Sequence, residues 1–141
     1  MNSHFSILVD SDTFVAIVRK EDSNHTKAKQ LYTRLEKLAV SFITSNYVFS
    51  EVVTVISQKL NHEKAIEFIN SMKSPGCMYN FIWITPEIEE MAIEIFKQQT
   101  SKNVSFVDCT NMALIKHDNL DVIFSFDEIY KKNGFKLASA L

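Results

Sequence analysis

The sequence predicts an α/β protein, a three-layer α/β/α sandwich built around a short, mostly parallel central sheet. Short apolar runs alternate with amphipathic helical segments along the chain, which is typical of strands joined by helical crossovers. The chain has 141 residues, within the range of about 100–200 expected of one domain. It contains only two Gly and two Pro, so no linker-like stretch divides it. We therefore expect residues 1–141 to form a single domain.

Local signals divide the first half of the chain into two strands and four helices. An apolar run ends at Asp10, and Asp12 is placed to cap the helix that follows. Ser74-Pro75-Gly76 is the strongest turn signal and ends the fourth helix. We expect strands at residues 5–9 and 40–43 and helices at about residues 12–20, 23–39, 45–60 and 62–73.

The second half repeats the alternation. Thr85 and Pro86 offer an N-cap and a proline at the first helical position, and Ser105 with Asp108 resembles a capping box. Gly134 closes a short terminal helix. We expect strands at residues 81–84 and 122–124, a possible edge strand at 135–137, and helices that begin near residues 86, 105 and 127.

Composition excludes several classes of protein. Fifteen Lys and Arg against 17 Asp and Glu give a net charge of −2, which argues against a polybasic protein that coats nucleic acid or a cationic membrane binder. Two cysteines cannot form a disulfide framework, and four scattered histidines argue against a His-built zinc site. No apolar run approaches the roughly 18 residues of a membrane span. We expect a soluble, cytoplasmic protein without a membrane partner.

Four carboxylates fall on segments that this topology directs to one edge of the sheet. Asp10 ends the first strand, Asp127 follows the fourth strand, Asp108 lies in the first turn of a helix, and Glu51 lies in the helix after the second strand. Ligands of parallel sheets collect outside the carboxyl ends of the strands. Glu51 has apolar neighbours and no Lys or Arg within the preceding turn, so we expect it to need a metal or a distant partner.

Each acid also has a purely structural interpretation. Asp108 and Asp127 are suited to capping helices, Asp10 to ending a strand or binding a backbone amide, and Glu51 to reaching solvent from its helix face. The predicted site would be absent only if all four structural interpretations were correct at once. The four acids together are therefore stronger evidence for a functional site than any one of them alone.

Clustered carboxylates stay ionised together only when a positive charge lies among them. Oxygen ligands select hard cations such as Mg²⁺ or Mn²⁺, which activate water and stabilise the leaving oxygen of a phosphodiester. The sequence shows no Gly-rich phosphate loop and no evident Ser-His or Cys-His pair. These acids therefore point to metal-dependent phosphoryl chemistry with water as the nucleophile.

With these residues identified, the chain resembles the PIN domain family, in particular the VapC-type toxin ribonucleases of type II toxin–antitoxin systems. The resemblance covers nearly the whole chain and keeps the order of the motifs. The motifs are Ile7-Leu8-Val9-Asp10-Ser11-Asp12, Ser50-Glu51-Val52-Val53, Ser105-Phe106-Val107-Asp108-Cys109 and Phe124-Ser125-Phe126-Asp127 followed by Asn133-Gly134-Phe135.

The resemblance implies an Mg²⁺- or Mn²⁺-dependent endoribonuclease that forms a homodimer and is inhibited by a small cognate antitoxin protein. It implies that four acids hold the metal and orient the attacking water: Asp10, Glu51, Asp108 and Asp127. Ser125 matches a small hydroxyl residue that supports the fourth acid. Asp12 stands where the family more often has a neutral residue, so it adds an outer acid, and Glu128 stands where a basic residue is common.

Two other functions remain open at this point. Asp10-Ser11-Asp12 resembles the Asp-x-Asp motif of haloacid-dehalogenase-like phosphatases, although Phe14 stands where that motif has Thr or Val. A phosphatase would turn over p-nitrophenyl phosphate through an aspartyl-phosphate. A catalytically silent module, either receiver-like or a degenerate PIN domain, would bind metal and a protein partner without cleaving RNA.

Overall fold

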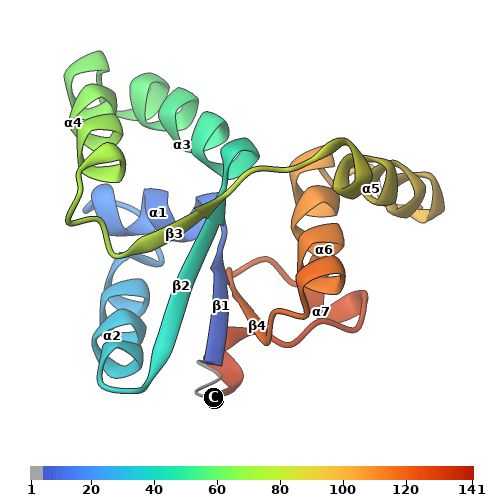
Figure 1. Cartoon of the computed structure of the whole chain (residues 1–141). Helices are drawn as coiled ribbons and strands as arrows, with labels where there is room; N and C mark the ends of the chain where they lie inside the picture. The colour runs from blue at the N-terminus through green and yellow to red at the C-terminus, as the bar shows by residue number, and fades with distance from the viewer. Residues whose placement is uncertain (1–4) are drawn as a thin grey trace.

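The computed structural model describes residues 5–141 as alternating strands and helices (Figure 1). The four strands are β1 (Phe5–Val9), β2 (Val40–Ser45), β3 (Tyr79–Ile82) and β4 (Val122–Phe124). The α-helices are α1 (Ser11–Val18), α2 (His25–Glu36), α3 (Asn46–Lys59), α4 (His62–Lys73), α5 (Pro86–Gln98), α6 (Phe106–Asp118) and α7 (Ile129–Lys132). A short 3₁₀ helix, η1 (Ala138–Ala140), follows α7.

The strands form one sheet in the order β3-β2-β1-β4, and every pair is parallel. Helices α1 to α4 cover one face, and α5 to α7 cover the other (Figure 1). The predicted three-layer α/β/α sandwich is therefore confirmed, with a sheet that is parallel throughout its four strands. None of the helices within residues 5–141 has the length and hydrophobicity of a membrane span.

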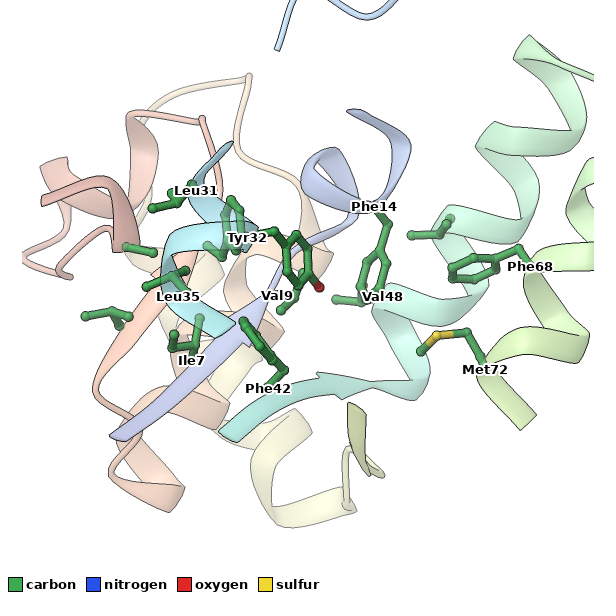
Figure 2. Packing of buried hydrophobic residues seen from close by; sticks show 14 of the residues in the cluster. Ile7, Val9, Phe14, Leu31, Tyr32, Leu35, Phe42, Val48, Phe68 and Met72 are labelled. Carbon is green, nitrogen blue, oxygen red and sulfur yellow. The ribbon is translucent and has the colours of Figure 1, made fainter. Parts of the chain in front are cut away.

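Buried side chains on the two sides of the sheet form separate cores. Along β1, Ile7 and Val9 pack toward α1–α4, whereas Leu8 packs toward α5 and α6, as the alternation of side chains along a strand requires. The first core is rich in aromatic rings, which Figure 2 shows between the sheet, α1, α2 and α4. Burial on both faces explains why the strands are continuous apolar runs in the sequence.

The register brings the carboxyl ends of the central strands together. Val9 of β1 lies beside Phe124 of β4, and the backbone N–H of Asp10 donates to the Phe124 carbonyl at 3.1 Å. Three helices begin at this edge, capped by Asp10, Ser45 and Ser105. The chain segments that carry the four predicted acids therefore all start from one edge of the sheet.

Several expected boundaries are corrected. Asp12 was expected to cap α1, but the cap is Asp10, whose carboxylate accepts from the Ser11 N–H at 2.7 Å. The strand leads directly into the helix without a loop, so Asp12 falls in the first turn. Strand β3 begins and ends two residues earlier than expected. The possible edge strand at 135–137 is reduced to a single bridge between Ile123 and Leu137.

The residue that ends α6 has a left-handed backbone conformation, and substitutions can test what this conformation requires. Asn119 ends this helix in the left-handed region, with φ 54°. We expect Asn119→Val to lower the free energy of unfolding by about 1–2 kcal/mol, because a branched Cβ crowds the backbone in that region. Asn119→Gly should change it by less than about 1 kcal/mol. Urea denaturation checks both variants, and equal effects would contradict this account of the turn.

Candidate active site

Two of the predicted acids meet at one phenol. The Tyr130 hydroxyl, from α7, lies 2.6 Å from Oδ2 of Asp10 and 3.1 Å from Oδ1 of Asp108. Asp10 caps α1, and Asp108 lies in the first turn of α6, so the contact joins three elements. Both carboxylates are buried, with exposed fractions of 3% and 8%, and Tyr130 is fully buried. The centre of the site is therefore a tyrosine that bridges two acids.

Asn111 completes this centre from behind. It lies one turn after Asp108 on α6, is fully buried, and donates from Nδ2 to Asp10 Oδ1 at 2.9 Å and to the Tyr130 hydroxyl at 3.0 Å. Because the phenol carries a single proton, it donates to only one of the two carboxylates at a time. Its contact with the other is a hydrogen bond only when that carboxyl is protonated.

Burial and mutual repulsion raise the pKa values of these acids. Burial, together with the negative charges of Asp12 and Asp108, raises the pKa of Asp10 to about 7, although the hydrogen bond from Tyr130 opposes the shift. Burial also raises the pKa of Asp108, and the charge of Asp127 adds to this effect. Ionisation of both acids is therefore unfavourable in the folded protein. A bound cation would stabilise their ionised forms.

Glu51 joins the centre through Ser11. The Ser11 hydroxyl donates to Glu51 Oε1, and the Ser11 N–H donates to Asp10, so one residue connects the two acids. Glu51 is half-buried rather than enclosed by apolar side chains as the sequence suggested, because its helix face borders a pocket. This pocket of about 490 Å³, which we call the α3–α6 cleft, is lined by Asn46, Tyr47, Ser50, Glu51, Thr54, Val55 and Val107.

Asp127 lies at the exposed margin of the site. Its carboxylate accepts from the Ile129 N–H at 3.0 Å, which resembles the capping role that its sequence position also suggested. Its charge still acts on the centre, because it raises the pKa of both Asp12 and Asp108. Asp127 therefore belongs to the electrostatic environment of the buried acids without touching Tyr130.

Ser125 and Asp12 shape the segment that carries Asp127. The Ser125 hydroxyl accepts from the Asp127 N–H at 3.1 Å and donates to Asp12 Oδ2 at 3.1 Å. The same Asp12 oxygen accepts from the Phe126 N–H at 2.7 Å. Burial raises the pKa of Asp12 to about 6. Asp12 thus holds the segment after β4 in place instead of capping its own helix.

The donor set suits a hard divalent cation. Every candidate ligand at this edge is a carboxylate, and oxygen-only sites favour Mg²⁺ or Mn²⁺. Within residues 5–141, no three acidic, histidine or cysteine side chains converge closely enough to surround one ion as the side chains are placed. Asp10 and Asp108 face the same hydroxyl, however, and burial together with neighbouring negative charge raises the pKa of both, so a bound cation would stabilise their ionised forms.

Sequence reasoning identified the acids but missed Tyr130 and Asn111. Asn111 had a weak signal, because a polar residue three positions after Asp108 lies on the same side of the helix. Tyr130 had none, since it is 120 residues away from Asp10 in the chain. Only the folded structure brings that hydroxyl between the two carboxylates.

Known proteins share this fold over most of the chain. The 23S rRNA-specific endonuclease VapC20 of Mycobacterium tuberculosis is 26% identical over 129 residues, which cover 92% of this chain and 95% of the relative. The crystal structure of VapC20, described as a Sarcin-Ricin loop cleaving toxin, superposes with a TM-score of 0.81 at 25% identity and the same two coverages.

More distant structures share the fold alone. FitAcB from Neisseria gonorrhoeae has a TM-score of 0.67 at 15% identity, with 96% of this chain and 99% of that chain covered. VapBC2 from Rickettsia felis, solved with a DNA fragment from its promoter, has a TM-score of 0.66 at 14% identity, with 94% and 96% covered. The family model described as PIN domain matches residues 7–136. With that match across nearly its whole length, the chain belongs to the PIN domain family.

Proposed function

We propose that this PIN domain is a metal-dependent endoribonuclease that cleaves RNA phosphodiester bonds and acts as the toxin of a toxin–antitoxin pair. One observation carries the proposal. Asp10 and Asp108, buried and with raised pKa values, share a hydroxyl at the carboxyl edge of the sheet, and Glu51 links Asp10 to an open cleft. The nuclease activity named for VapC20 supports the same reaction class.

The proposed ligands and catalytic acids are Asp10, Glu51, Asp108 and Asp127, with Ser125 and Asp12 in support. When bound, Mg²⁺ or Mn²⁺ lowers the pKa of the attacking water and stabilises the charge on the leaving oxygen. The protein places the acids for this chemistry. Tyr130 and Asn111 orient Asp10, Ser11 orients both Asp10 and Glu51, and Ser125 holds the backbone of Asp127.

The phosphatase alternative fits this centre less well. A haloacid-dehalogenase-like enzyme would use Asp10 as its nucleophile, but Phe14 stands where the motif of that family has Thr or Val. Membership in the PIN family and the nuclease relative favour RNA cleavage over both the phosphatase and a silent metal-binding module.

The proposed partners are an RNA substrate, a small antitoxin protein and a second copy of the chain, all in the cytoplasm. A structure named as a toxin–antitoxin complex, from Klebsiella pneumoniae, shares the fold with a TM-score of 0.59 at 15% identity. This likeness supports an antitoxin partner by analogy of fold. Co-expression with the product of an adjacent small gene, followed by size-exclusion chromatography, tests both the antitoxin and the dimer.

Incubation of purified, partner-free protein with total cellular RNA tests the activity. We expect discrete fragments with Mn²⁺ or Mg²⁺ and none with chelator. Asp108→Asn should reduce cleavage by at least about 100-fold, more than the loss expected of a residue that only orients a ligand. The matched control, Asp118→Asn, makes the same change at the exposed end of the same helix and should cleave normally. Metal-dependent cleavage by Asp108→Asn at the wild-type rate would contradict the assignment.

Metal binding can be measured without RNA. A ligand present at 100 times its dissociation constant stabilises the folded state by about 2.7 kcal/mol. We therefore expect saturating Mn²⁺ to raise the melting temperature of the wild type and of Asp118→Asn by several degrees. The same addition should leave Asp108→Asn nearly unchanged, because that variant lacks one proposed ligand. Equal shifts in all three proteins would place the ion elsewhere.

A further inference from the structure

A groove lies between α2 and the C-terminal segment, beside the candidate active site. It has a volume of about 390 Å³ and begins at Ser125 and Phe126, which follow β4 and are tied to Asp12. The groove lining, which we call the α2 groove, consists of Lys27, Gln30, Leu31, Arg34, Ser125, Phe126, Glu128, Leu137 and Ser139. It therefore continues directly from the segment that carries Asp127.

The α2 groove carries positive charge in a protein whose net charge is −2. Lys27 and Arg34 are seven residues apart, so they lie on the same side of the helix, about 10 Å apart along its axis. Both residues are exposed, and across residues 5–141 neither forms a salt bridge. Arg34 donates from Nη2 to the Leu141 carbonyl at 3.4 Å, and Glu128 is the one acid in the lining.

The rest of the lining suits a nucleotide. Phe126 is half-buried and adds an aromatic ring, and single-stranded RNA is commonly held by stacking of its bases on such rings. Gln30 and Ser139 supply hydrogen-bonding groups beside it. Cationic side chains, an aromatic ring and polar groups in one groove match the phosphate, the base and the sugar of a nucleotide.

We propose that the α2 groove is the subsite for a nucleotide next to the scissile phosphate, an inference that rests on the proposed ribonuclease function. Lys27 and Arg34 contact backbone phosphates, and the base stacks on Phe126. The RNA then passes over Ser125 and Phe126 toward the buried acids. The groove thus provides local attraction for RNA that the overall charge of the chain does not.

The test uses a fluorescein-labelled RNA hairpin that carries the sarcin–ricin loop, the target named for VapC20. Binding is measured by fluorescence anisotropy at several salt concentrations, with Asp10→Asn in every protein to prevent cleavage. Adding Lys27→Ala and Arg34→Ala should weaken binding by about 10-fold or more. It should also reduce the slope of log affinity against log salt by about 0.7 for each phosphate that the protein no longer neutralises.

The matched control is the pair Lys29→Ala and Lys37→Ala. These substitutions remove the same charge from the same helix and its C-cap, at exposed positions outside the α2 groove. We expect the control pair to leave the salt slope nearly unchanged. Equal loss of affinity and of slope in the two pairs would overturn the proposal, because the effect would then come from net charge alone.

A further substitution examines the stacking. Phe126→Leu keeps apolar packing against the core but removes the ring, so RNA affinity should fall at least about 5-fold. In the cleaving background with Asp10 intact, the Lys27 and Arg34 variants should raise KM, with kcat and Mn²⁺ affinity unchanged.

If those variants cleave and bind RNA like the control pair, the groove assignment is wrong while the ribonuclease proposal stands. If the wild type neither cleaves nor binds RNA, both the groove and the ribonuclease proposal fail.

Discussion

Asp10→Asn is expected to abolish metal-dependent RNA cleavage and, at the same time, to stabilise the metal-free protein. Asp10 is a proposed ligand, so its loss should reduce cleavage by at least about 100-fold, beyond the range for orienting residues. Its ionised carboxylate is also unfavourable in the folded protein, because burial and nearby negative charges raise its pKa to about 7. Removing the charge removes that repulsion.

The hydrogen bonds of the site can accommodate this substitution. The amide oxygen of Asn takes the place of Oδ1 and accepts from Ser11 and Asn111. The amide nitrogen takes the place of Oδ2 and donates to the Tyr130 hydroxyl, which then donates to Asp108. No buried group loses its partner, so the fold should remain intact.

The stabilisation should depend on pH with a definite sign. The pKa of Asp10 is about 7 in the folded protein against a reference of 3.8, so between these values the folded state binds more protons than the unfolded state. Wild-type stability therefore falls as pH rises through this range, and Asp10→Asn lacks this contribution. We expect the variant to exceed the wild type by about 1–3 kcal/mol at pH 8 and by much less at pH 5.

Thermal unfolding in chelator at pH 5 and pH 8, with the RNA assay alongside, checks both parts of this expectation. Asp118→Asn is again the control, because its carboxylate lies at the far end of α6. A variant that retains cleavage would remove Asp10 from the proposed machinery. An inactive variant that is less stable than the wild type at pH 8 would contradict the inference that the ionised Asp10 carboxylate destabilises the folded protein.

Tyr130→Phe tests the bridge between the two acids. The variant loses the hydroxyl that donates to Asp10 and leaves the Asn111 amide without one of its acceptors. Leaving buried polar groups unpaired costs about 1–3 kcal/mol, so we expect the metal-free protein to lose that much stability. Metal affinity should fall by about 10–100-fold, as for other residues that orient ligands.

The loss of metal affinity should also depend on pH. The hydrogen bond from Tyr130 lowers the pKa of the carboxyl that receives its proton, and its removal raises that pKa further. Protons then compete more strongly with the metal, and the deficit of Tyr130→Phe should be larger at pH 6.5 than at pH 8. Titration with Mn²⁺ followed by electron paramagnetic resonance measures this directly. A deficit that is constant with pH would assign Tyr130 a purely packing role.

Local chemistry in the sequence determined most of the elements. The Thr85 cap with Pro86, and the capping box of Ser105 and Asp108, involve residues within one turn, so their hydrogen bonds form as expected. Buried parallel strands are continuous apolar runs, so the alternation of strands and helices could be predicted from the sequence. Because parallel strands place their carboxyl ends at one edge, the sequence also predicted where the acids would gather.

The tertiary structure alone decided how those acids are held. Asp10 rather than Asp12 caps α1, because the β1–β4 pairing fixes where the strand ends, and Asp12 is drawn to the Ser125 segment. Tyr130 reaches Asp10 across 120 residues of chain, and no local pattern encodes such a contact. Residue spacing specifies which groups lie on one strand end or helix face. The hydrogen-bond partner of a buried carboxylate depends on how distant elements pack. Here the packing of α7 places the Tyr130 hydroxyl against Asp10.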